Sequence, residues 1–361
     1  MKILVAMSGG VDSSVVAALL HEAGHEVIGA TLQLYDHGAA VQKKGACCAG
    51  QDIHDARRVA DHLGIAHYVL DREQRFRDAV IRDFADSYAR GETPIPCIRC
   101  NQTVKFQDLM DLADDMGCEA LATGHYAQRI GDELHMAADP ARDQSYFLAH
   151  TTLPQLKRVL FPLGAMPDKA TVRAHAARLG VAVADKPDSQ DICFVPQGSY
   201  ADVVAKFRPD AMAPGEITDG AGRVLGEHQG IARYTVGQGR GLGIGGGERL
   251  FVQEIDAPRR RIVVGPKPAA QVIEADEVNW LAEPAGSFDC TVKLRAREAP
   301  HAAHVAWDGT RLAITPAAPS VAAPGQAAVM YRGTRVLGAG FIRAALTARD
   351  ARPNPAASVV V

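Results

Sequence analysis

The first half of the chain alternates between short apolar runs and segments of helical periodicity. Residues 2–7 (KILVAM) are almost entirely apolar, as in a parallel strand that is buried on both faces. Residues 13–23 then carry valine and leucine at helical spacing and stop before Gly24. The alternation continues, and it predicts further strands at 26–34, 65–70 and 119–126 and further helices at 52–64, 76–88 and 106–116.

The pattern changes after about Val195. Residues 196–268 consist of short apolar pieces separated by glycine and proline. Within them, residues 237–247 (GQGRGLGIGGG) hold seven glycines, which fit either a flexible lid or a tight-turn hairpin. From about residue 270 the apolar positions alternate with period two, and the Asp308-Gly309 turn predicts a hairpin.

These patterns together predict an α/β fold class. Strand–helix repeats of about 30 residues indicate a doubly wound parallel sheet over residues 1–195. A small central domain is expected over 196–268, a C-terminal β-barrel over 269–350 and a loosely ordered tail over 351–361.

Composition narrows the class of protein. No apolar run approaches the roughly 18 residues that a membrane span needs, and the start of the chain lacks the features of a signal peptide. We therefore expect a cytoplasmic protein with no membrane partner. Residues 1–196 hold 20 Lys and Arg against 26 Asp and Glu, whereas residues 197–361 hold 19 against 16. The mildly basic second half is compatible with a polyanionic partner.

The first candidate chemistry lies directly after the first strand, in the stretch MSGGVDSS (7–14). A glycine-rich turn between a parallel strand and its helix points backbone N–H groups at one spot, and the helix N-terminus adds positive potential. Gly9 and Gly10 permit the close approach of a phosphate, and the serines add donors. Asp12 would repel phosphate unless Mg²⁺ stood between them.

This stretch resembles the PP-loop of the ATP pyrophosphatase group, whose members transfer AMP to a substrate oxygen and release pyrophosphate. It matches neither the Walker loop nor the dinucleotide fingerprint, because it lacks the lysine of the first and the third glycine of the second. The resemblance implies ATP, with Mg²⁺ near Asp12, and leaves the adenylated substrate open. The alternative is a helix start rich in small residues that binds nothing.

Three cysteines stand near expected element ends. An odd number of seven cysteines, in a chain without an export signal, argues against a disulfide scaffold. Cys97 and Cys100 lie in a Pro-rich stretch that we expect to be a loop just before a helix, whose dipole would favour the Cys100 thiolate. Cys193, taken alone, fits a small buried apolar residue beside Phe194.

Seven ordered motifs extend the resemblance to nearly the whole chain, from residue 2 to about 343. They are AMSGGVDSS, TPxPxxxCNxxxKF, ATGHY, DQSYFL, DSxxICF, GEHQG and PGQ. In this order they resemble the bacterial tRNA-specific 2-thiouridylase (MnmA) family. That family makes 2-thiouridine at the wobble position of the tRNAs for Lys, Glu and Gln. It uses ATP and a sulfur that a persulfide carrier or cysteine desulfurase passes on.

Matched motif by motif, the resemblance implies roles for individual residues. Cys100 would be the nucleophile and Cys193 the persulfide carrier, and the two would end each cycle as a disulfide. ATP would lie on Ala6, Met7, Ser8, Gly9, Gly10, Val11, Asp12, Ser13, Leu32 and Gly124. The tRNA would contact the barrel and Ile95, Pro96, Cys97, His125, Arg142, Asp143, Gln144, Arg295, Ala296 and Gln326.

Two positions depart from the family pattern. Ala296 stands where the family has Tyr, and Ile95-Pro96-Cys97 stands where it has Asn-Pro-Asp. The second change gives three thiols, Cys97, Cys100 and Cys193, which could hold a [4Fe–4S] cluster as in a related group of tRNA thiolases. We favour Cys97 as a spare thiol. A different PP-loop adenylating enzyme, which would not need Cys100 and Cys193, is the remaining alternative.

Overall fold

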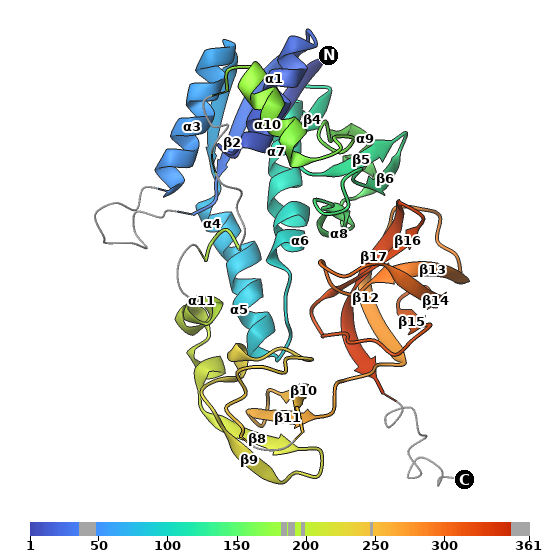
Figure 1. The fold of residues 1–361 in the computed structure, drawn as a ribbon. Coiled ribbons are helices and arrows are strands. Elements are labelled where there is room, and N and C mark those ends of the chain that lie inside the picture. The colour runs from blue at the N-terminus through green and yellow to red at the C-terminus, as the bar shows by residue number, and fades with distance from the viewer. Residues whose placement is uncertain (36–47, 182–185, 187–191, 196–198, 246–247, 348–361) are drawn as a thin grey trace. The chain divides into compact units, whose positions relative to one another are not determined.

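The computed structural model describes residues 1–35, 48–181, 186, 192–195, 199–245 and 248–347. The chain forms two compact units, and many of their elements are labelled in Figure 1. The first comprises Met1–Ile81, Pro96–Pro196 and Thr334–Val336, and the second comprises Arg82–Ile95, Gln197–Gly333 and Leu337–Val361. Within the described ranges, no helix is both long enough and apolar enough to span a membrane.

A five-stranded parallel sheet forms the centre of the first unit and confirms the predicted doubly wound α/β class. The strand order is β3-β2-β1-β4-β7, so the chain runs outward from β1 in one direction and then returns to β4 on its other side. Ile3 of β1 pairs with Val27 on one side and Ala120 on the other. The strands are β1 (Lys2–Ala6), β2 (Glu26–Gln33), β3 (Ala66–Asp71), β4 (Ala120–Ala122) and β7 (Val159–Leu160).

Helices cover both faces of this sheet. Side chains alternate along β1, so Ile3 and Val5 share one face. There they join a buried cluster with α1 (Val11–Glu22), α3 (Cys48–Leu63) and α10 (Lys169–Arg178). Helix α7 (Phe106–Asp115) contacts β1 and β4 but adds no described residue to that cluster, so it covers the opposite face.

The other elements of the first unit are short. A hairpin follows β4, and its second strand pairs His135 with Arg335 at the start of β17 (Arg335–Leu346). The hairpin strands are β5 (Ala127–Ile130) and β6 (Glu133–Met136). The helices are α4 (Glu73–Phe76), α6 (Pro96–Cys100), α8 (Ser145–Leu148), α9 (Leu153–Arg158) and two π-helical segments, η1 (Arg77–Ile81) and η2 (Asn101–Lys105).

The second unit contains a small four-stranded sheet of order β10-β11-β8-β9. Its buried His228 donates from Nε2 to the Arg260 carbonyl at 2.9 Å and accepts at Nδ1 from the Gly230 N–H at 3.1 Å. The histidine of the GEHQG motif therefore fixes a turn. The elements are α5 (Arg82–Ala89), α11 (Tyr200–Phe207), η3 (Pro209–Met212), β8 (Gly215–Asp219), β9 (Val224–His228), η4 (Ile231–Arg233), β10 (Phe251–Asp256) and β11 (Arg261–Gly265).

The same unit ends in the predicted antiparallel barrel. Six strands run in the order β12-β15-β14-β13-β16-β17, and pairing between β12 and β17 closes the cylinder. Its interior is apolar, with Ile273, Val292 and Ile314 fully buried. The predicted hairpin at Asp308-Gly309 joins β14 to β15. The first five strands are β12 (Val272–Trp280), β13 (Ser287–Lys293), β14 (His301–Trp307), β15 (Leu312–Pro316) and β16 (Ala327–Arg332).

The structure departs from, or leaves outside the described residues, three local features predicted from the sequence. The expected loop at Cys97 and Cys100 is wrong, because the helix begins at Pro96, where a proline suits the first helical position. In the glycine-rich stretch, the described residues 237–245 contain no strand, so no hairpin forms within them. The tail 351–361 lies outside the described residues.

Candidate active site

The sheet topology brings two loops of the first unit together. The chain leaves the neighbouring strands β1 and β4 in opposite directions, so their carboxyl ends form the topological switch point at which open α/β sheets commonly bind ligands. The predicted phosphate loop follows β1, and Gly124 follows β4. A Cβ atom on Gly124 would lie 2.9 Å from the backbone nitrogen of Ser13, so a larger residue would force the two loops apart.

The phosphate loop has a conformation that glycine makes possible. Gly9 has a φ of +73°, and a Cβ there would lie 2.1 Å from the carbonyl oxygen of Asp52. Ser13 Oγ accepts from the Ser8 N–H at 3.1 Å and draws the loop toward α1. Gly10 provides no side-chain cap for α1. The first-turn N–H groups are therefore available to an anion.

The carboxylate of Asp12 is paired within the protein. Lys169 Nζ and the Tyr126 hydroxyl both donate to Asp12 Oδ1 at 2.7 Å. Lys169 is the first residue of α10, is 9% exposed, and lies with its Nζ 5.7 Å from the centre of the Tyr126 ring. The ammonium therefore offsets the charge of Asp12 directly beside the phosphate loop.

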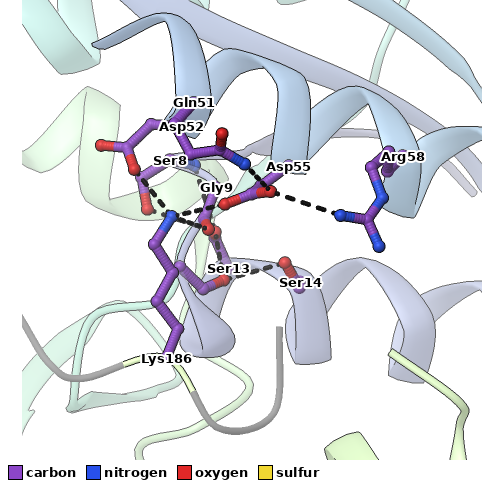
Figure 2. A network of polar contacts seen from close by, with 10 residues as sticks. Ser8, Gly9, Ser13, Ser14, Gln51, Asp52, Asp55, Arg58 and Lys186 are labelled. Atoms are coloured by element: carbon purple, nitrogen blue, oxygen red, sulfur yellow. Dashed lines mark hydrogen bonds and ion pairs between the residues drawn. The ribbon is translucent and has the colours of Figure 1, made fainter. Parts of the chain in front are cut away.

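A second lysine joins the loop to α3, as Figure 2 shows. Lys186 Nζ donates to the Gly9 carbonyl at 3.0 Å, to Asp52 Oδ1 at 2.7 Å and to Asp55 Oδ2 at 2.8 Å. Burial works against its charge, but the hydrogen bonds to the two carboxylates outweigh it and raise the pKa of Lys186. The segment that leads to Cys193 is thus attached to the loop at Lys186.

The predicted nucleophile is buried. Cys100 is 4% exposed and packs with Phe76, Val80 and Val104, whereas Cys97 on the same short helix is exposed. Burial raises the pKa of Cys100 to about 12. The expected helix-dipole effect is therefore wrong for this conformation, because Cys100 is the fifth residue of the helix and its apolar surroundings outweigh the dipole.

The predicted persulfide carrier lies beside this cluster. The ring of Phe194, the residue after Cys193, lies 5.7 Å from the ring of Phe76 in an edge-on contact. Cys193 is exposed, and its charge and that of Cys97 each contribute to raising the pKa of Cys100. The structure thus gathers the three thiols singled out in the sequence around one apolar cluster.

A lysine that the sequence analysis did not single out lies among these thiols. Lys105 ends the π-helical segment after Cys100, and its positive charge lowers the pKa of Cys100 against the larger effect of burial. It also lowers the pKa of Cys193, which is exposed as a residue but whose thiol is partly shielded from water by the protein atoms around it, and this shielding raises its pKa. Burial lowers the pKa of His125 to about 3, and the positive charge of Lys105 adds to this effect. His125, whose Nδ1 is 3.0 Å from Thr123 Oγ1, is therefore neutral at physiological pH.

Comparison with known proteins identifies the family of the chain. Three consecutive families match, described as tRNA methyl transferase HUP domain (residues 1–197), tRNA methyl transferase PRC-barrel domain (201–266) and Aminomethyltransferase beta-barrel domain (270–342). A relative in Acidiphilium cryptum, named tRNA-specific 2-thiouridylase MnmA, is 64% identical over 95% of this chain and 100% of its own length. The chain belongs to the MnmA family.

Further comparisons extend this result. The MnmA protein of Gluconobacter oxydans is 59% identical over 95% of this chain and 99% of its own length. Among solved structures, a 4-thiouridine synthetase in complex with RNA and ATP is 17% identical, covers 58% of this chain and 50% of that chain, and has a TM-score of 0.34. So low a score supports no argument about this chain.

The residues predicted to hold ATP fit a nucleotide to different degrees. The uncapped start of α1 and the Gly9 turn leave backbone N–H groups that a phosphate could accept from, as predicted for the loop. The side chain of Met7 lies in the core, so only its backbone can face a ligand. Leu32 packs against the Phe76 and Cys100 cluster. Among the described residues, no group of three or more His, Cys, Asp and Glu is arranged to hold a metal ion.

Several residues predicted to contact tRNA have structural partners. Asp143 accepts from the Ala137 and Ser145 N–H groups and from the Ser145 hydroxyl, and Gln144 accepts from the Tyr126 N–H. In the second unit, Arg295 donates to the Val236 carbonyl, Gln326 donates to the Thr93 carbonyl, and Ile95 is 8% exposed. Pro96 is buried, while Ala296 and Arg142 are half-buried.

Sequence reasoning missed the cations of the site. Lys169 and Lys186 lie far in the sequence from their partners Asp12 and Asp52. Lys105 is close in sequence to Cys100, and the π-helical segment between them is not visible in the sequence pattern. Signals for two of them were present, because Lys105 belongs to the TPxPxxxCNxxxKF motif and Lys186 stands just before DSxxICF. Lys169 had no motif, and only the pairing of α10 with α1 reveals it.

Proposed function

We propose that this MnmA-family chain forms 2-thiouridine at the wobble position of the tRNAs for Lys, Glu and Gln, using ATP, Mg²⁺ and a persulfide on Cys193. The observation that carries the proposal is that one compact unit holds both a loop suited to phosphate and a pair of thiols suited to sulfur transfer. The phosphate loop at Gly9 and the thiols Cys100 and Cys193 belong to the same unit, and Lys186 binds the loop seven residues before Cys193.

The first step activates the base. The O2 oxygen of uracil attacks the α-phosphorus of ATP, and pyrophosphate leaves. The N–H groups at the start of α1 and the Lys169 ammonium stabilise the departing negative charge. Mg²⁺, when bound, would supply further charge neutralisation between the phosphates. The base must leave the anticodon stack to reach this site.

The second step replaces oxygen by sulfur. The terminal sulfur of a Cys193 persulfide adds at C2, and AMP leaves with the former O2. Cys100 then attacks Cys193 Sγ, so that the bond between the two persulfide sulfurs breaks and the outer sulfur stays on C2 as the thiocarbonyl. The resulting Cys100–Cys193 disulfide is reduced by a dithiol before the next cycle. Attack of Cys100 before transfer, which would release hydrosulfide, is the variant route.

Nucleoside analysis tests the proposal. Anaerobically purified protein is incubated with ATP, Mg²⁺, a persulfide donor and each of the three tRNAs, after its absorbance at wavelengths of iron–sulfur clusters has been recorded. We expect 2-thiouridine without an iron absorbance, and none with Cys193→Ser. Activity only in protein with a brown chromophore would instead make Cys97 a ligand of a [4Fe–4S] cluster.

The phosphate loop is tested separately. Asp12→Ala should abolish tRNA-dependent release of pyrophosphate and leave tRNA binding largely intact, because Asp12 is the carboxylate expected to hold the Mg²⁺ that accompanies ATP. Loss of tRNA binding together with pyrophosphate release would contradict the assignment of Asp12 to the ATP site alone. Activity that survives Cys193→Ser would point to a different adenylating enzyme.

A further inference from the structure

Two of the ordered sequence motifs bind each other within the second unit. The TPxP stretch contributes Thr93, and the PGQ stretch contributes Pro324 and Gln326. The Thr93 N–H donates to the Pro324 carbonyl at 2.7 Å, and the Thr93 carbonyl accepts from Gln326 Nε2 at 2.7 Å. Residues 324–326 therefore bond both backbone polar groups of Thr93, and we call this contact the Thr93 clasp.

Gly325 makes so close a contact possible. Its φ is +87°, which favours glycine, and a Cβ there would lie 2.9 Å from the Thr93 nitrogen and 3.0 Å from Glu92 Cβ. Any other residue would therefore push the Thr93 segment away from the PGQ stretch. The glycine thus supports the clasp for a steric reason that is independent of the Gln326 hydrogen bond.

The barrel fixes the residues that hold Thr93. The Gly325 N–H donates to the Ile342 carbonyl, and the Ile342 N–H donates to the Gln326 carbonyl, both at 2.8 Å. Ile342 is fully buried in β17, and β16 begins directly after Gln326. The next residue of β17, Arg343, also forms an ion pair with Glu92 at 3.6 Å. The clasp therefore attaches Thr93 to the wall of the barrel.

The residues after Thr93 carry this fixed position along the chain. A proline holds its own φ and restricts the residue before it to extended conformations. Pro94 and Pro96 therefore restrict Thr93 and Ile95, so these four consecutive residues keep little backbone freedom. Fixing Thr93 consequently fixes Ile95, which is 8% exposed.

We infer that Gln326 and Gly325 are positioning residues, which hold Thr93 so that Ile95 is preorganised for the target base. The inference rests on the proposed function in that the segment beginning at Ile95 meets this base. The sequence resemblance implied that Gln326 contacts tRNA itself. In the structure its amide donates to the protein backbone instead. The clasp thereby makes the position of Ile95 depend on the barrel.

The test compares two clasp variants with two matched controls. Gln326→Met removes the donor and keeps the length of the side chain. Gln253→Met removes a similar donor, which binds the Pro266 carbonyl at 3.1 Å elsewhere in the unit. Gly325→Ala adds the Cβ, and Gly309→Ala adds one at a φ of +99° where no described atom beyond its chain neighbours lies within 4 Å. If Gly325→Ala does not fold, Gln326→Met carries the test.

The full-length proteins are compared by hydrogen–deuterium exchange of peptides covering residues 91–98, by the Kd for tRNA, and by kcat for tRNA-dependent release of pyrophosphate. Both clasp variants should exchange this segment roughly three- to tenfold faster, in line with the loss of one neutral hydrogen bond. Their kcat should fall about tenfold, because the base meets a segment that is no longer preorganised. The Kd for tRNA should stay as in the wild type, and both controls should match the wild type throughout.

Weaker tRNA binding by Gln326→Met with an unchanged kcat would overturn the inference, because Gln326 would then contact RNA directly. Exchange of residues 91–98 at the wild-type rate in the clasp variants would overturn it as well. Exchange and tRNA binding are measured without any thiolated base. Failure of the proposed function would appear in the wild type as missing 2-thiouridine, with the exchange difference between clasp and control variants still present.

Discussion

At the scale of residues, charge pairing explains how an aspartate can stand in a phosphate loop. Lys169 and Tyr126 converge on one oxygen of Asp12. An anion that approaches the start of α1 therefore meets a neutralised carboxylate together with N–H donors. The sequence predicted the loop and its carboxylate because both lie in one continuous motif. It could not predict Lys169, which lies 157 residues away.

Lys169→Met should slow tRNA-dependent pyrophosphate release about a hundredfold, because the uncompensated Asp12 charge would then repel the phosphates. The measurement is a coupled pyrophosphate assay at saturating tRNA. Lys157→Met is the matched control, since Lys157 forms a surface ion pair with Asp132 on the same unit. Similar losses in the two variants would show that the effect is unspecific.

The buried thiol of Cys100 makes a prediction about stability and pH. An unfolded cysteine titrates near pH 8.5, whereas the folded Cys100 keeps its proton up to about pH 12. Between these values the unfolded state binds fewer protons than the folded state, so stability falls as pH rises. For this group alone the slope approaches about 1.4 kcal/mol per pH unit.

Denaturant unfolding between pH 8 and 11 in the presence of reductant should therefore show a steeper loss of stability in the wild type than in Cys100→Ser. Serine does not titrate in this range, and its hydroxyl is close in size to the thiol. Parallel pH dependences for the two proteins would mean that Cys100 ionises freely in the folded state.

At the scale of elements, the helix that carries Cys100 has an irregularity that no sequence pattern revealed. The helical stretch from Pro96 to Asp115 passes through the π-helical segment η2, and η1 interrupts the neighbouring helix. Segments α6 and η1 contact each other around the Phe76 and Cys100 cluster. Such π-helical turns are frequent at functional sites, where one added residue redirects the side chains before it.

Deleting Gln102 tests this role. Removing one residue from η2 should restore an ordinary α-helix and turn α6 by about 100° relative to α7, which moves Cys100 away from Phe76. Formation of 2-thiouridine should be lost while ATP binding is retained. Gln102→Ala keeps the length and should stay active. Retained activity in the deletion variant would show that the π-helical turn has no part in placing Cys100.

Secondary structure that depends on local patterns could be predicted from the sequence, whereas a helix start with more than one local interpretation could not. Apolar runs such as residues 2–7 predicted the sheet, because a strand that is buried on both faces carries apolar side chains at nearly every position. Period-two alternation predicted the barrel hairpin at Asp308-Gly309. The helical placement of Cys97 was missed because Pro96 was taken as a loop residue, although a proline also starts helices.

At the scale of the whole molecule, separate cores imply separate unfolding. The sheet of the first unit and the barrel of the second each enclose their own buried cluster. The phosphate loop belongs to the first unit alone. A ligand that binds only the folded form of that unit stabilises it by mass action.

Calorimetry should therefore resolve two transitions, and a non-hydrolysable ATP analogue should raise only one of them. At a hundredfold excess over its Kd the analogue stabilises the first unit by about 2.7 kcal/mol. Asp12→Ala should remove the shift. A single transition that moves as a whole with the analogue would contradict independent unfolding of the two units.

The closure of the barrel has a consequence for how such a domain is acquired. The first strand β12 pairs with the last strand β17, and the Gln271 N–H donates to the Leu346 carbonyl at 2.8 Å. The chain therefore enters and leaves this domain at neighbouring points. A segment with adjacent ends can be inserted into, or excised from, a longer gene without re-threading the rest of the polypeptide. Evolution can thus exchange such a domain between unrelated enzymes as one cassette.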